Sequence, residues 1–179
     1  MSTYGSIAFV DQTKGFVIEV NGPDMMYSGR GKEICNILTK ITPQDLKDKR
    51  NLDKIFYGVV MYVNYLRAKS HERSIKEMFK RDFLEQIGFT GAYWEFKTEP
   101  IKKVPLPQIA IVNGDGSEWT YIKNITNKPV LLPVYASCNY KEPKYLYEVE
   151  PYGVCCLNWG HMPKGNNMYN RNLKLVREY

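Results

Sequence analysis

A glycine-rich stretch followed by a lysine is the first part of this sequence that could do chemistry. Residues 29–32 read Gly-Arg-Gly-Lys and precede a segment with helical spacing, an order of elements found in phosphate-binding loops. The nucleotide-binding pattern G-x-x-x-x-G-K-[ST] needs another glycine where Met26 stands and a hydroxyl residue where Glu33 stands. A carboxylate at that position would repel a phosphate. We therefore expect the glycines to let the chain turn, with a minor role for Arg30 and Lys32 in contacting a phosphate or an acidic partner.

The side chains that could act as acids, bases or nucleophiles lack the partners that a catalytic site needs. His161 lies at a predicted strand end, and Cys155 or Cys156 could approach it in space. No nucleophile motif and no recognisable carboxylate pair accompany them. The adjacent cysteines should instead point to opposite faces of one strand as buried, reduced thiols. We expect no catalytic residue, no cofactor and no metal, because the cysteines and histidines also lack metal-ligand spacing.

The composition is typical of one folded globular domain. The chain has 179 residues, of which 44% are hydrophobic and 25% charged. The net charge is +6 and is spread along the sequence, which predicts salt-sensitive steering toward nucleic acid or anionic lipid. Because no signal peptide and no apolar run of about 18 residues is visible, we expect a cytoplasmic protein, or a virion protein if the chain is viral.

The first half of the chain has strand signals interrupted by short helices. Residues 12–15 separate two β-branched runs, which indicates a hairpin. The apolar residues of 33–41 have helical spacing, whereas the β-branched and aromatic run 55–66 predicts a long interior strand. The expected elements are strands at 6–11, 16–20 and 55–66, and helices at 33–41, from 42 onward and between Ser74 and Gly88.

The second half has the short strands and turn residues typical of an antiparallel β-sandwich or a curved sheet. The expected strands are 92–97, 108–112, 118–124, 130–137, 145–150 and 154–159, with an extended connector at 102–107 that could serve as an exposed docking segment. The fold class we predict is α+β: such a sandwich or curved sheet, with two to three short helices in the N-terminal half. We interpret residues 1–179 as a single α+β domain.

Two sets of residues are expected to make contacts with partners. The segment 171–177 alternates polar and apolar residues, which predicts an edge strand that a neighbouring copy could extend. Its contact residues would be Arg171, Leu173, Lys174, Leu175, Val176 and Arg177. The residues expected to make electrostatic contacts are Arg30, Lys32, Lys76, Lys80, Arg81, Lys102 and Lys103.

A further set of aromatic residues has two interpretations. Rings with lysines between them could stack on the bases of single-stranded RNA. The same pattern is found in a sheet core with tyrosines at its rim, and we favour this second interpretation. The residues concerned are Tyr93, Trp94, Phe96, Trp119 and Tyr121, with Lys97 and Lys123 between them.

The first ninety residues resemble, in the order of their elements, the matrix proteins of rhabdoviruses. The parallel consists of a strand ("GFVIEVN"), a turn, a short helix ("KEICNILTKI") and a long aromatic strand ("KIFYGVVMYVNYLRAKS"). The resemblance implies a non-enzymatic protein that self-associates, condenses a helical nucleocapsid and joins it to a membrane.

The C-terminal third is similar to the β-domain of von Hippel-Lindau-type adaptors. The similarity lies in a strand pair that precedes a Gly-His dipeptide, and it implies a protein-binding β-sandwich module. The residues that carry it are Asn124, Pro129, Val130, Leu132, Tyr145, Gly153 and His161.

The function we expect is assembly rather than catalysis. The first hypothesis is a self-associating structural protein of viral matrix type, a homo-oligomer that contacts nucleocapsid or RNA and an anionic membrane surface, with no small-molecule substrate. The second is an RNA-binding or host-protein-binding β-sandwich module. The third is a small hydrolase or transferase that uses His161 and a cysteine.

Overall fold

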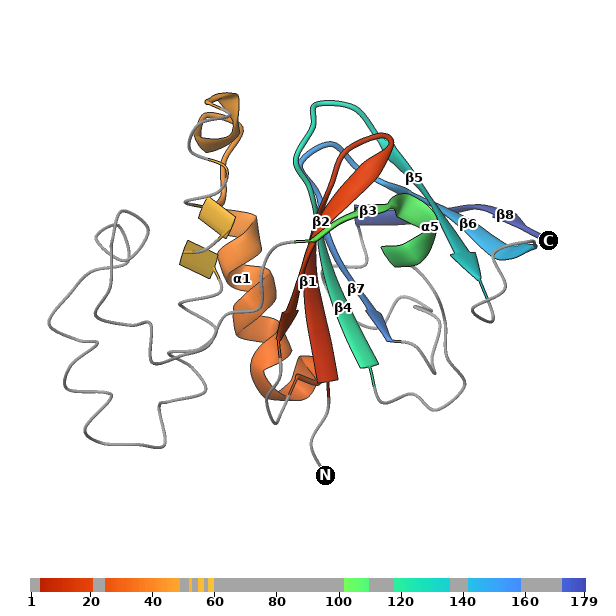
Figure 1. The fold of residues 1–179 in the computed structure, drawn as a ribbon, viewed down its shortest axis with the longest axis horizontal. Coiled ribbons are helices and arrows are strands. Elements are labelled where there is room, and N and C mark those ends of the chain that lie inside the picture. The colour runs from red at the N-terminus through yellow and green to blue at the C-terminus, as the bar shows by residue number, and fades with distance from the viewer. Residues whose placement is uncertain are drawn as a thin grey trace, which may run out of the picture.

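The computed structural model describes most of the chain outside 60–101. The described residues are 4–20, 25–48, 52, 55–56, 58–59, 102–109, 118–135, 142–158 and 172–179. Within them, two β-sheets and helix α1 form the main elements, with α1 and the smaller sheet on opposite sides of the larger sheet (Figure 1).

The larger sheet, here called sheet A, has five strands in the order β3-β2-β1-β4-β7. These strands are β1 (Tyr4–Val10), β2 (Lys14–Val20), β3 (Lys102–Pro105), β4 (Glu118–Asn124) and β7 (Val154–Asn158). The smaller sheet, sheet B, has the order β5-β6-β8 and consists of β5 (Val130–Tyr135), β6 (Pro143–Val149) and β8 (Leu173–Glu178).

Most of the predicted strands are confirmed within one to three residues at their ends. The β1–β2 hairpin forms where Asp11 accepts hydrogen bonds from the backbone N–H groups of Thr13 and Lys14, at 2.8 and 2.9 Å. This is the local turn chemistry that favours aspartate at such positions. The expectation of antiparallel pairing is wrong at one place, because β1 and β4 run parallel. Sheet A is therefore mixed, while all pairs in sheet B are antiparallel.

The helical segment after β2 agrees with its sequence pattern. Helix α1 (Lys32–Lys40) follows a wide helical turn, η1 (Tyr27–Gly31), and buries its apolar stripe. The helix expected from residue 42 is a single 3₁₀ turn, η2 (Asp45–Lys47). At its start, Thr42 and Asp45 exchange hydrogen bonds in the manner of a capping box.

The predicted strand at 55–66 is wrong in the part that the structure describes. Residues 55–56 and 58–59 are helical, and Ile55, Phe56 and Val59 are buried. The ring of Phe56 stacks on Phe9 of β1, with centroids 4.1 Å apart. A helical turn can place Phe56 over sheet A, and this packing outweighs the strand preference of its β-branched neighbours. Residues 74–88 and 92–97, where a helix and a strand were predicted, lie outside the described residues.

The extended connector predicted at 102–107 is also corrected. Its first part is strand β3, which pairs with β2, and its second part begins the helical turn α5 (Leu106–Ile109). That turn also replaces the start of the strand predicted at 108–112. Leu106 and Ile109 are buried against the second core cluster described below, so their burial explains why the segment is not free for docking.

Two buried clusters hold the layers together. The first lies between α1 and sheet A and includes Phe9, Leu38, Tyr121 and Cys156. The second joins sheet A to sheet B and α5; it includes Val10, Ile122 and Cys155 from sheet A and Leu132, Tyr147 and Val149 from sheet B. The adjacent cysteines of β7 thus point to opposite faces, as predicted. The described chain has an α+β arrangement.

A close approach between layers makes a glycine necessary at the start of α1. A Cβ atom on Gly31 would lie 2.0 Å from the hydroxyl oxygen of Tyr121 and 2.9 Å from the carbonyl oxygen of Met26. We predict that Gly31→Ala lowers the free energy of unfolding by about 1–3 kcal/mol, although alanine is the better helix former. Chemical denaturation measures this change. Tyr121→Phe removes the nearest clashing atom, so the double variant should lose less than the sum of the two single losses; simple additivity would contradict the steric explanation.

Candidate functional site

The predicted electrostatic residues do not form one patch in the described chain. Arg30 and Lys32 lie by the η1–α1 junction, close to Met25, which packs on Gly5 at one end of β1. Lys102 and Lys103 lie on β3, which pairs with 14–17 of β2, toward the other end of sheet A. Lys103 is exposed, with its ammonium 5.5 Å from the ring centroid of Phe16. Lys76, Lys80 and Arg81 lie outside the described residues.

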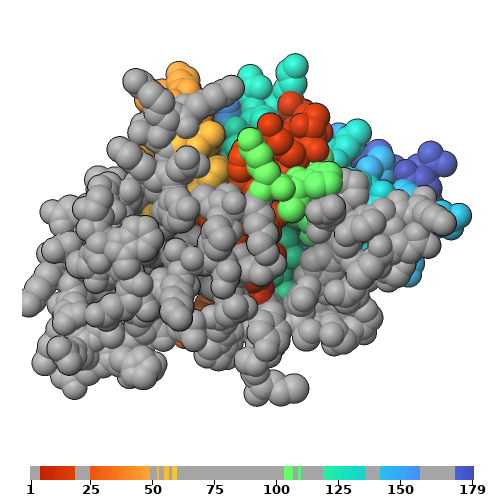
Figure 2. All heavy atoms as spheres, viewed as in Figure 1, coloured from red at the N-terminus to blue at the C-terminus, as the bar shows by residue number. Residues whose placement is uncertain are grey.

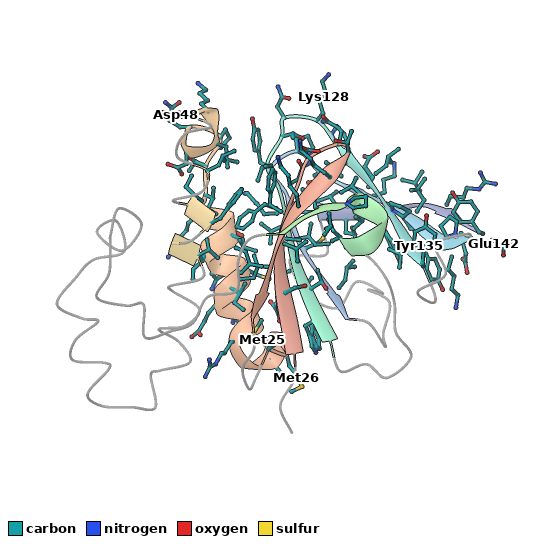
Figure 3. All side chains as sticks on the ribbon, in the orientation of Figure 1. Met25, Met26, Asp48, Lys128, Tyr135 and Glu142 are labelled. Atoms are coloured by element: carbon teal, nitrogen blue, oxygen red, sulfur yellow. The ribbon has the colours of Figure 1, made fainter. Side chains whose placement is uncertain are left out.

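The glycine-rich stretch is a turn and not a phosphate cradle. The N–H groups of Gly29 and Gly31 both donate to the carbonyl oxygen of Met26, each at 3.0 Å. The hydroxyl of buried Tyr121 donates to the neighbouring carbonyl of Met25. Figure 3 places Met25 and Met26 at the start of this turn. The N–H groups of both glycines are therefore already used within the turn, which agrees with the structural role expected from the sequence.

The described cysteines have the environment of core thiols. Cys35, Cys155 and Cys156 are buried and form no disulfide. Burial raises the pKa of Cys35 and of Cys156 well above the usual range, and that of Cys155 to about 12. These groups remain protonated near neutral pH and are poor nucleophiles. Cys138 and His161 lie outside the described residues.

Within 4–59 and 102–179, as far as these are described, no group of three His, Cys, Asp or Glu side chains is placed to hold a metal ion. No helix in the described part of the chain is long and apolar enough to span a membrane.

The aromatic set is part of the core wherever the structure describes it. Tyr121 is fully buried, and Trp119 packs against the first core cluster. Lys123, the lysine next to these two rings on β4, is only 2% exposed. These positions confirm the core interpretation for β4. Tyr93, Trp94, Phe96 and Lys97 lie outside the described residues.

A polar corner joins the two sheets at the end of β4. Asn124 is fully buried, and its amide nitrogen lies within hydrogen-bond distance of the carbonyl oxygens of Lys128, Val149 and Glu150, at 2.8, 3.2 and 3.0 Å. Its amide oxygen accepts from the backbone N–H and the hydroxyl of Thr126, at 2.9 and 2.8 Å. One side chain thus joins the β4–β5 turn to the end of β6. Residues 124–126 read Asn-Ile-Thr, which matches the N-glycosylation pattern, but an amide that is buried and hydrogen-bonded in this way cannot be glycosylated in the folded state.

Lys123 supports the same corner from the other face of β4. Its ammonium donates to the carbonyl oxygen of Tyr152 at 2.7 Å. Tyr152 has a positive φ of 56° and lies in a turn closed by a 2.8 Å hydrogen bond from the N–H of Gly153 to the carbonyl of Glu150. Burial lowers the pKa of Lys123 to about 8. This lysine therefore stabilises the turn only at the cost of desolvating its charge.

The surface of sheet B is where large apolar side chains meet solvent. Leu131, Leu175, Val176 and Tyr179 are 46–55% exposed. Figure 2 shows the sheet B elements at the surface on one side of the molecule. Of the predicted edge residues, Leu173 packs partly into the second cluster, Lys174, Leu175, Val176 and Arg177 are exposed, and Arg171 lies outside the described residues. Sequence reasoning missed Leu131 and Tyr179; the alternation of Leu131 with buried Val130 and Leu132 was the available signal for Leu131.

Comparison with known proteins gives no relative from which a function can be transferred. No protein-family model matches the chain, and neither the curated proteins nor the solved structures give a significant match.

The hydrogen bonds of Asn124 predict that substitutions at this position lower the stability of the fold. Asn124→Ala should lower the free energy of unfolding by about 3 kcal/mol, because the buried carbonyl of Val149 and the part-buried carbonyl of Glu150 lose their donor. Asn124→Asp should cost more, since it places a carboxylate oxygen against the same carbonyls. Urea denaturation measures both changes. Asn127→Ala, in the exposed part of the same turn, serves as the control and should change stability by less than about 0.5 kcal/mol; equal losses at both positions would contradict the role of the corner.

The lowered pKa of Lys123 predicts that the difference in stability between the wild type and a Lys123→Met variant depends on pH. The folded pKa lies below the unfolded value of 10.5, so the unfolded chain binds more protons between about pH 8 and 10.5. Wild-type stability therefore gains from Lys123 as pH rises through this window. Lys123→Met should be more stable than wild type by about 1–3 kcal/mol at pH 7, and its advantage should shrink from pH 8 to pH 10.

Denaturation of wild type and variant at each pH measures this difference and cancels the contributions of other groups. Lys128→Met, at an exposed position, is the control and should show no such trend. A Lys123→Met protein that is less stable at pH 7, or an advantage independent of pH, would contradict a desolvated charge at this position.

Proposed function

We propose that this chain is a non-enzymatic interaction protein that self-associates through sheet B. The observation that carries the proposal is the position of the exposed large apolar side chains in the described residues. Leu131, Leu175, Val176 and Tyr179 all lie on sheet B or directly after its last strand, and Met26 lies elsewhere. Leu131 and Tyr179 lie on the face of sheet B that points away from sheet A, whereas Leu175 lies opposite Tyr147 on the other face, at the sheet edge. Exposed apolar and tyrosine side chains of this kind are typical of protein contact surfaces.

The charges of sheet B support a second copy as its partner. The strands of sheet B carry three basic side chains, Lys144, Lys174 and Arg177, and two acidic ones, Glu148 and Glu178. Their net charge is only +1, compared with +6 for the whole chain. Because both signs are present in sheet B, two copies can form opposite-charge contacts there, whereas a polyanion would find little net attraction.

The wider role that we propose is the structural, matrix-type one implied by the sequence resemblance. The basic residues outside sheet B, such as Lys32 and Lys103, would then remain available for an acidic nucleocapsid or membrane surface in the cytoplasm or virion. The element-order parallel with matrix proteins loses support from its fourth element, because residues 55–59 are helical where they are described. The shared cluster between the sheets supports a finer proposal for the fold, in which sheets A and B form a β-sandwich and α1 adds a third layer.

Self-association through sheet B predicts a difference between two exposed apolar positions. Leu131→Ser should weaken dimerisation by about tenfold, because it removes an apolar contact from the interface. Met26→Ser is the matched control: Met26 is 41% exposed but lies outside sheet B, so dimerisation should be unchanged. Sedimentation equilibrium over a range of protein concentrations measures both constants. Wild-type protein that remains monomeric at every concentration would refute the proposed function.

A further inference from the structure

The outer face of sheet B is the face that points away from sheet A. Its side chains form three rows that run across the strands. In a strand, alternate side chains point to opposite faces, and directly opposite residues share a face. Val130, Leu132, Tyr147 and Val149 are buried toward sheet A, so their neighbours point outward. The pairing then gives a first row of Leu131, Glu148 and Lys174, and a second row of Pro133, Leu146 and Arg177. The third row holds Lys144 and Tyr179, which are joined by a 3.0 Å backbone hydrogen bond.

A bulge in β8 sets the composition of these rows. Leu175 lies opposite Tyr147 and Arg177 lies opposite Leu146, so β8 has one extra residue, Val176, at this point. With regular pairing, Arg177 would lie opposite Tyr145 and point toward sheet A. The bulge turns Arg177 to the outer face, where its guanidinium carbon lies 4.6 Å from the ring centroid of Tyr179. Arginine and tyrosine are among the residue types enriched at the centre of protein contacts.

The edge of β8 is less suited to pairing than the outer face. A bulge disrupts the regular spacing of backbone groups that an incoming strand would need, and charged residues on an edge have the same effect. Beside the bulge lie the charges of Lys174, Arg177 and Glu178. The opposite edge of the sheet, β5, contains Pro133, which has no N–H group to donate.

The outer face is complementary to itself along β6. Along β6, the outward residues are Lys144, Leu146 and Glu148. A twofold axis that passes near Leu146 would place the two leucines together and would place Glu148 of each copy over Lys144 of the other. Lys144 is exposed near the start of β6, and Glu148 lies near the end of the same strand, as this pairing requires.

On this basis, and resting on the self-association proposed above, we propose that two copies pack outer face to outer face about a twofold axis at Leu146, with reciprocal Glu148–Lys144 ion pairs. Aligned packing of two sheets accommodates such a contact. The Arg177–Tyr179 pair and Leu131 then lie within the interface rather than at a strand edge.

Charge exchange across the twofold axis tests this arrangement. Glu148→Lys and Lys144→Glu should each weaken dimerisation by about tenfold, because each reversal creates two like-charge contacts in the symmetric dimer. The double variant restores opposite charges in exchanged positions and should recover wild-type dimerisation. Sedimentation equilibrium at low salt measures the constants, and thermal unfolding confirms that each variant is folded.

The controls carry the same changes in charge at other positions. Glu178→Lys matches Glu148→Lys but lies opposite Tyr145, on the other face of sheet B. Lys128→Glu matches Lys144→Glu but lies in the β4–β5 turn, labelled in Figure 3. Both controls should dimerise like wild type. If wild type dimerises and the double variant does not recover, or if the controls weaken dimerisation equally, the face-to-face arrangement is wrong while self-association stands; a wild type that never dimerises overturns both.

Discussion

The buried amide of Asn124 is the constraint on which the arrangement of the two sheets depends. The chain leaves sheet A after β4 and returns to it before β7, and both crossings occur at one corner. Backbone polar groups at such a crossing cannot join either sheet's ladder, and those that are shielded from water need other partners. Asn124 bonds to three carbonyls and to Thr126, and Lys123 bonds to the carbonyl of Tyr152. With the polar groups of this corner hydrogen-bonded, sheet B can pack on sheet A with one face and present its outer face to solvent.

The local patterns of the sequence were sufficient for most elements but not for their arrangement. Strand β4 has the bounds predicted from its alternation and turns, and α1 begins and ends within one residue of the apolar stripe. The run at 55–59 was misassigned because β-branched and aromatic residues suit a strand and a buried helical turn alike, and only packing against Phe9 decides between them. The parallel pairing of β1 with β4 depends on residues far apart in the chain, which a local pattern does not report.

The candidate interaction surface was predictable only in part. Alternation identified β8 as a strand suited to an edge, and the structure places it at the end of sheet B. The bulge at Val176 reverses the orientation of Arg177 relative to simple alternation, so no reading of β8 alone could assign this arginine to the outer face. Lys123 is a residue for which the sequence pattern suggests a contact surface and the structure shows a buried position. A lysine among aromatic residues resembles a nucleic-acid contact, but here its stem is in the core and its ammonium bonds to a turn.

Because both faces of β7 are buried, hydrophobic burial does little to fix the register in which this strand pairs. Val154 and Cys156 face α1, while Cys155 and Leu157 face sheet B. A slip by one residue usually moves apolar groups into water, and this penalty selects the native pairing. In β7 a slip would exchange one thiol for the other and leave both faces apolar, so hydrophobicity discriminates weakly between the two alignments. The native register is selected next to the strand, where the carbonyl of Gly153 accepts a hydrogen bond from the N–H of Asn124 at 2.9 Å. Hydrogen bonds at one end of β7 thus fix the register that its apolar side chains leave undetermined.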